Sequence, residues 1–211
     1  MRTDDLIARL ASDAPPVKPL APPMRRALVT LGAIGIAGLL AIALSDVRVF
    51  LSRYAAREIW MGLEMAAVLA TGLLAVTAAF FASVPGRSKL WSAAPLPFLA
   101  AWLALSGKGC ADLAATGELR SGDSWHCLLF ITGSGLVLAV PLAWALSRAR
   151  PVDPVRVALL AGLGTAALST FLLTFFHSFD VTVIDLAVHI VAILVVTATV
   201  GAFNRRALHP A

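Results

Sequence analysis

Residues 108–127 read KGCADLAATGELRSGDSWHC, a polar stretch in a chain that otherwise consists mostly of long apolar segments. The stretch contains both cysteines of the protein, Cys110 and Cys127, with 16 residues between them. On either side of it, the apolar runs approach the ~20 residues that a helix needs to cross ~30 Å of hydrocarbon. This contrast indicates a membrane-embedded frame with a small, chemically reactive patch on one side.

The composition favours the same class of protein. Hydrophobic residues make up 59% of the 211 residues, charged residues make up 14%, and the mean hydropathy is +0.87. Soluble domains are nearer half apolar and a quarter charged, so we expect a polytopic membrane protein. The net charge of +5 comes from short basic clusters between apolar runs, which is a topology signal and not a nucleic-acid-binding surface.

Six apolar segments predict an all-α fold, a six-transmembrane-helix bundle preceded by a short cytosolic helix. No alternating pattern of a β-barrel is present, so helix is the only regular structure that can span. Pro95 and Pro97 stand near the start of the third segment, so its helix is expected to be tilted or to begin late. The predicted spans are about 27–44, 59–82, 90–106, 126–147, 155–176 and 182–203.

Glycines within two of these segments predict close helix packing, because small residues let helix backbones approach one another. They are Gly32, Gly35 and Gly38 in the first segment, and Gly162 and Gly164 in the fifth.

Residues 1–26 form a separate arm. Thr3 is a suitable N-cap, and Asp4 and Asp5 follow in the first turn, where the helix dipole favours acidic residues. Leu6, Ile7 and Leu10 then give one apolar stripe on a short helix. The proline-rich run PPVKPLAPP ends that helix and continues as an extended linker. Because prolines precede the first apolar run, no cleavable signal peptide is expected.

The distribution of Lys and Arg predicts the orientation. Twelve of the 17 basic residues fall on one side of the predicted spans and five on the other. The positive-inside rule places the larger group, which includes both termini and the tail of residues 205–211, in the cytoplasm. The connection with the cysteines is then outside, in the periplasm if the membrane is the inner membrane of a Gram-negative bacterium.

Cys110 and Cys127 therefore lie where an oxidising compartment allows them to pair. Three interpretations stay open: a permanent disulfide, a reversible redox or metal-responsive pair with His126 next to it, and two unrelated thiols. His177 and Asp180 in the fifth connection add borderline ligands, so transient Zn²⁺ or Cd²⁺ binding at the outer face is possible chemistry. The spacing matches no compact metal motif, and no resident cofactor is expected.

Glu64 lies about as deep in the second segment as His189 does in the sixth, and Asp185 shares a helix face with His189 at i, i+4. Ionisable groups inside a membrane are costly and usually face a partner or a cavity. A Glu64–His189 pair is therefore expected, either as a functional site or as a buried polar contact that fixes helix packing.

The order of features resembles a known family. The start TDDLIARLA, the linker PPVKPLAPP, six spans with both ends inside and external cysteines are similar to the membrane anti-sigma factors of the NrsF-like (negative regulator of sigma F) family of Proteobacteria. The resemblance implies a non-enzymatic inner-membrane regulator that holds an extracytoplasmic-function sigma factor and releases it when periplasmic cysteines meet an oxidant or a heavy metal. It implies sigma-factor contacts at Asp4, Asp5, Leu6, Ile7 and Leu10, and a sensor at Cys110 and Cys127.

Two other classes compete with this one. A membrane thiol oxidoreductase needs a second exchange-competent cysteine pair or a CxxC motif, and the sequence has neither. A small ion or solute transporter could use Glu64, Asp185 and His189 as a path, but it would not need the apolar arm. Membrane lipids are the other expected partners, and direct binding of nucleic acid is not expected.

Overall fold

The computed structural model describes residues 3–12, 19–115, 124–176 and 183–208, and each regular element in these ranges is a helix. The all-α prediction is confirmed. The elements are α1 (Thr3–Ser12), α2 (Pro23–Ala43), α3 (Val47–Ala82), the 3₁₀ helix η1 (Lys89–Ala93), α4 (Leu96–Ala115), α5 (Ser124–Ser147), α6 (Pro154–Leu173) and α7 (Val183–Leu208).

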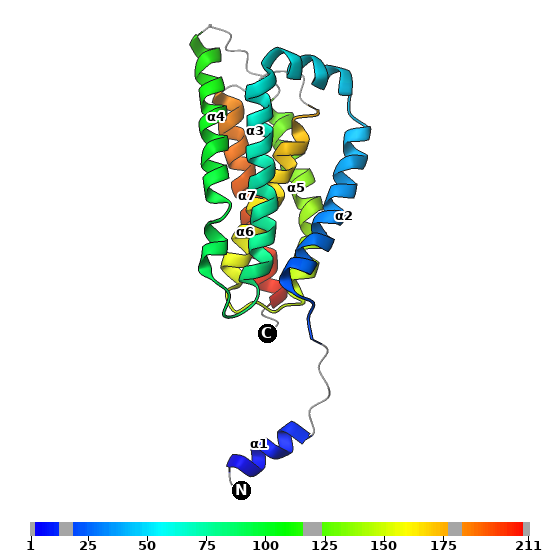
Figure 1. Cartoon of the computed structure of the whole chain (residues 1–211), viewed down its shortest axis with the longest axis vertical. Helices are drawn as coiled ribbons and strands as arrows, with labels where there is room; N and C mark the ends of the chain where they lie inside the picture. The colour runs from blue at the N-terminus through cyan, green and yellow to red at the C-terminus, as the bar shows by residue number, and fades with distance from the viewer. Residues whose placement is uncertain (1–2, 13–18, 116–123, 177–182, 209–211) are drawn as a thin grey trace.

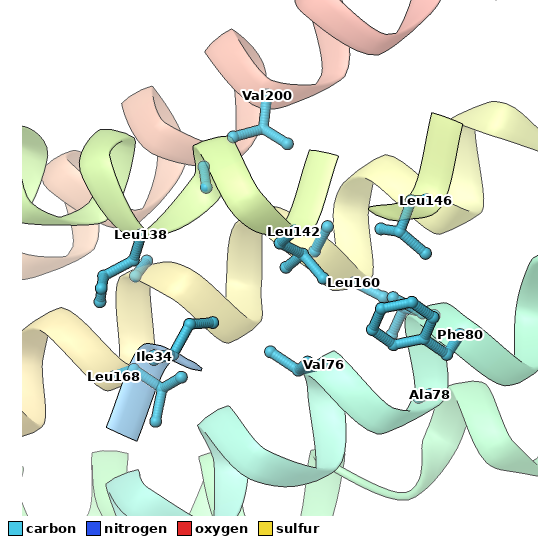
Figure 2. Packing of buried hydrophobic residues seen from close by; sticks show 14 of the residues in the cluster. Ile34, Val76, Ala78, Phe80, Leu138, Leu142, Leu146, Leu160, Leu168 and Val200 are labelled. Atoms are coloured by element: carbon cyan, nitrogen blue, oxygen red, sulfur yellow. The ribbon is translucent and has the colours of Figure 1, made fainter. Parts of the chain in front are cut away.

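Helices α2 to α7 form one bundle with α6 at its centre (Figure 1). Helix α6 packs against α3, α5 and α7, and most of its residues are buried. Figure 2 shows the main core, in which apolar side chains from five helices converge. The residues labelled there include Ile34 of α2, Val76 and Phe80 of α3, Leu138, Leu142 and Leu146 of α5, Leu160 and Leu168 of α6, and Val200 of α7.

Within the described residues, five segments are long and apolar enough to cross a membrane. A shorter apolar stretch, Leu186–Val200, lies inside α7, in the sixth predicted span. The structure is therefore compatible with a membrane protein, and the count of six spans stays a prediction. The five segments are Pro23–Ala43, Ile59–Ala82, Lys89–Lys108, Trp125–Ser147 and Pro154–Leu173.

Helix α3 begins twelve residues earlier than the predicted span of 59–82, and it has 36 residues. The Asp46 carboxylate caps it by accepting a hydrogen bond from the Arg48 backbone N–H at 3.1 Å. At 1.5 Å per residue, 36 residues exceed the ~30 Å of hydrocarbon. In Figure 1 the first turns of α3 lie across the end of the bundle before the helix turns along it. Phe50 and Tyr54 in these turns are partly buried.

Helix α4 begins late, as the prolines predict, and it also ends late. Residues 89–93 form the separate helix η1, and α4 starts at Leu96, between Pro95 and Pro97. Proline is tolerated in a first helical turn because its missing N–H has no partner there. The helix then continues to Ala115, past the predicted end at 106. Cys110 therefore belongs to helix α4 and not to the connection in which the sequence analysis placed it.

The predicted close packing at glycines is confirmed for α6 and wrong for two glycines of α2. A Cβ on Gly162 would lie 2.4 Å from the Thr197 Cα, and one on Gly164 would lie 2.7 Å from the Val76 Cγ2. A Cβ on Gly32 or Gly35 would meet nothing within 4 Å, and one on Gly38 would make an ordinary 3.4 Å contact. Close backbone approach is therefore a property of the α6–α7 and α6–α3 contacts.

This difference predicts a stability effect. Gly162→Ala should destabilise the bundle by about 1–3 kcal/mol, because the added methyl group meets backbone and forces α6 and α7 apart. Gly32→Ala is the matched control and should leave stability unchanged or slightly raised. The measurement is thermal unfolding of the purified protein in detergent; equal midpoints for the two variants would contradict the α6–α7 packing.

Candidate functional site

The predicted partner-binding stripe lies on α1, which has no buried residue. The exposed fractions of Leu6, Ile7 and Leu10 are 41%, 59% and 64%. Asp4 and Asp5 lie in the first turn, as predicted, and Arg9 lies in the last turn, where a positive charge suits the helix dipole. An apolar stripe on a helix of ten residues is typical of a segment that docks into a partner's groove.

Of the two cysteines, the side chain of Cys127 is described and that of Cys110 is not. Cys127 lies in the first turns of α5 and is 1% exposed. It packs in an apolar cluster with Ile131, Leu173 and Ala192, which joins α5, α6 and α7. Apolar burial lowers the reactivity of a thiol, because the reactive thiolate is charged. A reagent can therefore reach Cys127 only if the cluster opens.

The other predicted ligands do not gather around Cys127 in the described part of the chain. His126 is exposed next to it in sequence. His177 and Asp180 lie outside the described residues, as does the side chain of Asp185. Among the groups that are described, no set of three His, Cys, Asp or Glu side chains is placed to hold a metal ion.

Glu64 and His189 line one cavity between α3, α4, α6 and α7. His189 is only 4% exposed, and Glu64 is partly buried. The cavity volume is ≈ 60 Å³, which leaves room for a few waters at roughly 10–15 Å³ each. The other polar side chains that line it are Arg53, Ser106, Thr170 and Thr174.

Two threonine hydroxyl groups at the C-terminal end of α6 line this cavity, and both already donate a hydrogen bond to a backbone carbonyl. Thr170 Oγ1 donates to the Ala166 carbonyl at 3.0 Å, and Thr174 Oγ1 donates to the Thr170 carbonyl at 3.4 Å. Each hydroxyl oxygen can still accept a hydrogen bond. With a carboxylate, an imidazole and a guanidinium on the same walls, the cavity can hold water or a small polar solute.

Arg53 places a cation at the end of this cavity near Thr174, a role that the sequence alone did not reveal. Its guanidinium donates to the Thr174 carbonyl near the end of α6, with Nη1 at 3.4 Å from the oxygen. Phe50, one turn earlier in α3, stacks on Phe175 with ring centroids 4.5 Å apart. The spacing of Phe50, Arg53 and Tyr54 at i, i+3 and i+4 is the sequence signal that could have identified this face of α3.

Arg26 connects three helices at the opposite end of the bundle. Its Nη2 donates to the Ala145 carbonyl at 2.6 Å, and its guanidinium lies 5.1 Å from the centroid of the Phe80 ring. Ala145 is in the last turn of α5, where carbonyls lack helical partners and the dipole favours a cation. Residues 19–22, the described end of the Pro-rich stretch, thus lead into a helix whose first turn contains a residue that joins α2, α3 and α5.

The fold is that of a helical bundle in which five of the described segments have membrane-spanning length, with an exposed amphipathic arm before it. The family model described as Negative regulator of sigma F, or NrsF, matches residues 10–209. The chain therefore belongs to the NrsF family, which confirms the resemblance seen in the sequence. The match starts at Leu10, so Asp4, Asp5, Leu6 and Ile7 precede it. No curated protein and no solved structure matches the chain.

Proposed function

We propose that this protein is an integral inner-membrane anti-sigma factor that holds an extracytoplasmic-function sigma factor and releases it in response to an oxidant or a heavy metal. The observation that carries the proposal is the NrsF match over residues 10–209. Membership of this family implies a negative regulator with a sigma factor as its partner, and it supports the proposal that the protein is not an enzyme. Beyond what the family implies, we propose the class of sigma factor, the inducing signal and the inner-membrane location.

The arm is the proposed sigma-binding element. The exposed stripe of Leu6, Ile7 and Leu10 supports this role, since an apolar helix face without buried contacts needs a partner to cover it. Asp4 and Asp5 would face the basic surface with which a sigma factor contacts DNA. A short helix is marginal alone in water and is fully ordered only on binding, which keeps the affinity moderate and the complex reversible.

Both chain ends are proposed to be cytoplasmic. The ends of α3 and α5 and the starts of α2, α4 and α6 share one end of the bundle (Figure 1), and most of the basic residues flank these ends in the sequence. Reporter fusions at Gly86, Gly117 and Arg150 should therefore report cytoplasm, periplasm and cytoplasm. A fusion at Gly117 that is active only in the cytoplasm would overturn the orientation and the argument for exposed thiols.

Cys110 and Cys127 are the proposed sensor, with His126 as a neighbouring base or ligand. The burial of Cys127 supports a switch in one respect. Because Cys127 packs against Leu173 and Ala192, a disulfide or a shared metal on its sulfur would disturb the contacts of α5 with α6 and α7. Transient Zn²⁺ or Cd²⁺ would act at the same face, where His177 and Asp180 also occur in the sequence. A permanent disulfide is the alternative.

Glu64 and His189 are proposed to interact directly across their cavity. Polar contacts between membrane helices are worth about 0.6 kcal/mol on average and up to about 1.7. A double-mutant cycle with Glu64→Gln and His189→Gln, read from thermal unfolding in detergent, should therefore give a coupling of about 0.5–1.5 kcal/mol. If the effects of the two substitutions on stability are additive, Glu64 and His189 do not interact.

The polar cavity also favours one alternative, a small ion or solute transporter that uses Glu64 and His189. Copurification from the native host separates the two functions. The full chain should retain a sigma factor, and a chain without residues 1–12 should not. If no sigma factor copurifies with either chain, while Glu64→Gln abolishes a solute flux, transport is the function.

A further inference from the structure

A second cavity lies far from the polar one, on the surface formed by α5 and α7. Its volume is ≈ 500 Å³, within the range of about 300–1,000 Å³ that ligand sites occupy. Its walls include Ala139, Val140, Ala143 and Trp144 of α5 and Val200 of α7. Ala139 and Ala143 stand one turn apart, and their short side chains leave the hollow between the two helices.

The hydroxyl groups on these walls already donate their protons within their own helices. Ser147 Oγ donates to the Trp144 carbonyl at 2.9 Å, and Thr199 Oγ1 donates to the Val195 carbonyl at 2.8 Å. The cavity therefore presents a hydrocarbon-like wall, and it lies in the parts of α5 and α7 nearest to their C-termini. A ligand for it needs an apolar chain.

A cation lies at the end of this surface cavity, the α5–α7 groove. The guanidinium carbon of Arg148 lies 3.8 Å from the centroid of the Trp144 ring, and both side chains are exposed. The nearby Asp153 is engaged elsewhere, as it caps α6 and lies 3.6 Å from the Arg156 side chain. Among the described residues, no carboxylate forms an ion pair with Arg148. Its charge is therefore available to an anion at the membrane surface.

We propose that this groove is a binding site for one anionic phospholipid, with an acyl chain between α5 and α7 and the phosphate on Arg148. Two observations select this occupant. The apolar groove lies along α5, which has spanning length, and the apolar part of α7. Its exposed cation has the charge opposite to that of a phosphate and lies beside Trp144, a residue type common at the membrane interface. The proposed orientation assigns the lipid to the cytoplasmic leaflet, but the site itself does not depend on sigma-factor binding.

Native mass spectrometry of the full chain in detergent tests this site with added phosphatidylglycerol and phosphatidylethanolamine. The wild type should retain the anionic lipid in preference to the zwitterionic one. Arg148→Gln should lower the retention of phosphatidylglycerol about fivefold, the effect of one interfacial arginine, and should leave phosphatidylethanolamine nearly unchanged. Ala143→Leu, checked for its thermal midpoint, should lower the retention of both lipids because it fills the groove.

Arg87→Gln is the matched control. Arg87 also lies over an aromatic ring, that of Phe81 at 5.9 Å, at the same end of the bundle but away from the groove. The Arg87→Gln variant should retain phosphatidylglycerol as the wild type does. Equal loss in the two arginine variants, no preference of the wild type between the lipids, or displacement of the lipid by inorganic phosphate would each overturn the proposal.

Discussion

Replacing both Leu6 and Leu10 with alanine is expected to weaken sigma-factor binding about a hundredfold, because two apolar anchors in an interface are typically worth a few kcal/mol. Both side chains are exposed on one face of α1 and support no packing within the bundle. The variant should therefore insert and accumulate normally while it fails to repress. The measurement is transcription from a sigma-dependent promoter, with the protein level in the membrane determined in parallel.

The opposite face of α1 provides the control. Ser12 projects away from the stripe in the last turn, so Ser12→Gln changes an exposed position and keeps the apolar anchors and the first-turn acids. This control should repress as the wild type does. Full repression by the Leu6→Ala, Leu10→Ala variant at normal abundance would exclude the stripe as the binding element.

Replacing either Cys110 or Cys127 with serine is expected to abolish the response to oxidant or Cd²⁺. A switch needs both thiols, whether they form a disulfide or share a metal, so one remaining thiol cannot complete either reaction. Repression without the signal should persist, because serine keeps nearly the same volume as cysteine at the buried position 127. Promoter activity before and after treatment measures this effect, and His126→Gln tests the neighbouring imidazole separately.

Thiol labelling of intact cells separates the switch from the permanent disulfide. A switch requires that the labelling of Cys110 and Cys127 changes on treatment with oxidant or Cd²⁺. If the pair is disulfide-bonded under every condition, and the serine variants only lose abundance, the two cysteines are a structural crosslink.

Helices α5 and α6 agree with the predicted segments 126–147 and 155–176 to within three residues at each end, because uninterrupted apolar runs set the limits of a membrane-length helix. The start of α3 could not be predicted in the same way. Arg48 and Arg53 break the apolar run, although a helix with one buried face tolerates them. The end of α4 was missed for the same reason, since Lys108 and the polar residues after it resemble a loop.

The candidate sites depend on tertiary contacts to different degrees. The exposed stripe of α1 follows from local periodicity alone and was foreseen. That Glu64 and His189 line one cavity follows from their similar depth in two spans, but the addition of Arg53 requires the turn of α3 across the bundle. The contact of Arg26 with Ala145 joins residues 119 positions apart, and no sequence pattern marks it.

The central claim is that the chain holds a sigma factor through its arm and releases it on a signal from the cysteines. The most direct test is a binding titration of the copurified sigma factor with the full chain in lipid nanodiscs, before and after oxidant or Cd²⁺. We expect the untreated full chain to bind the sigma factor and a chain without residues 1–12 not to bind it. The treatment should weaken binding by the full chain at least tenfold and should leave binding by the Cys127→Ser variant unchanged. Equal binding with and without residues 1–12, or no binding of a sigma factor by the untreated chain, would contradict it.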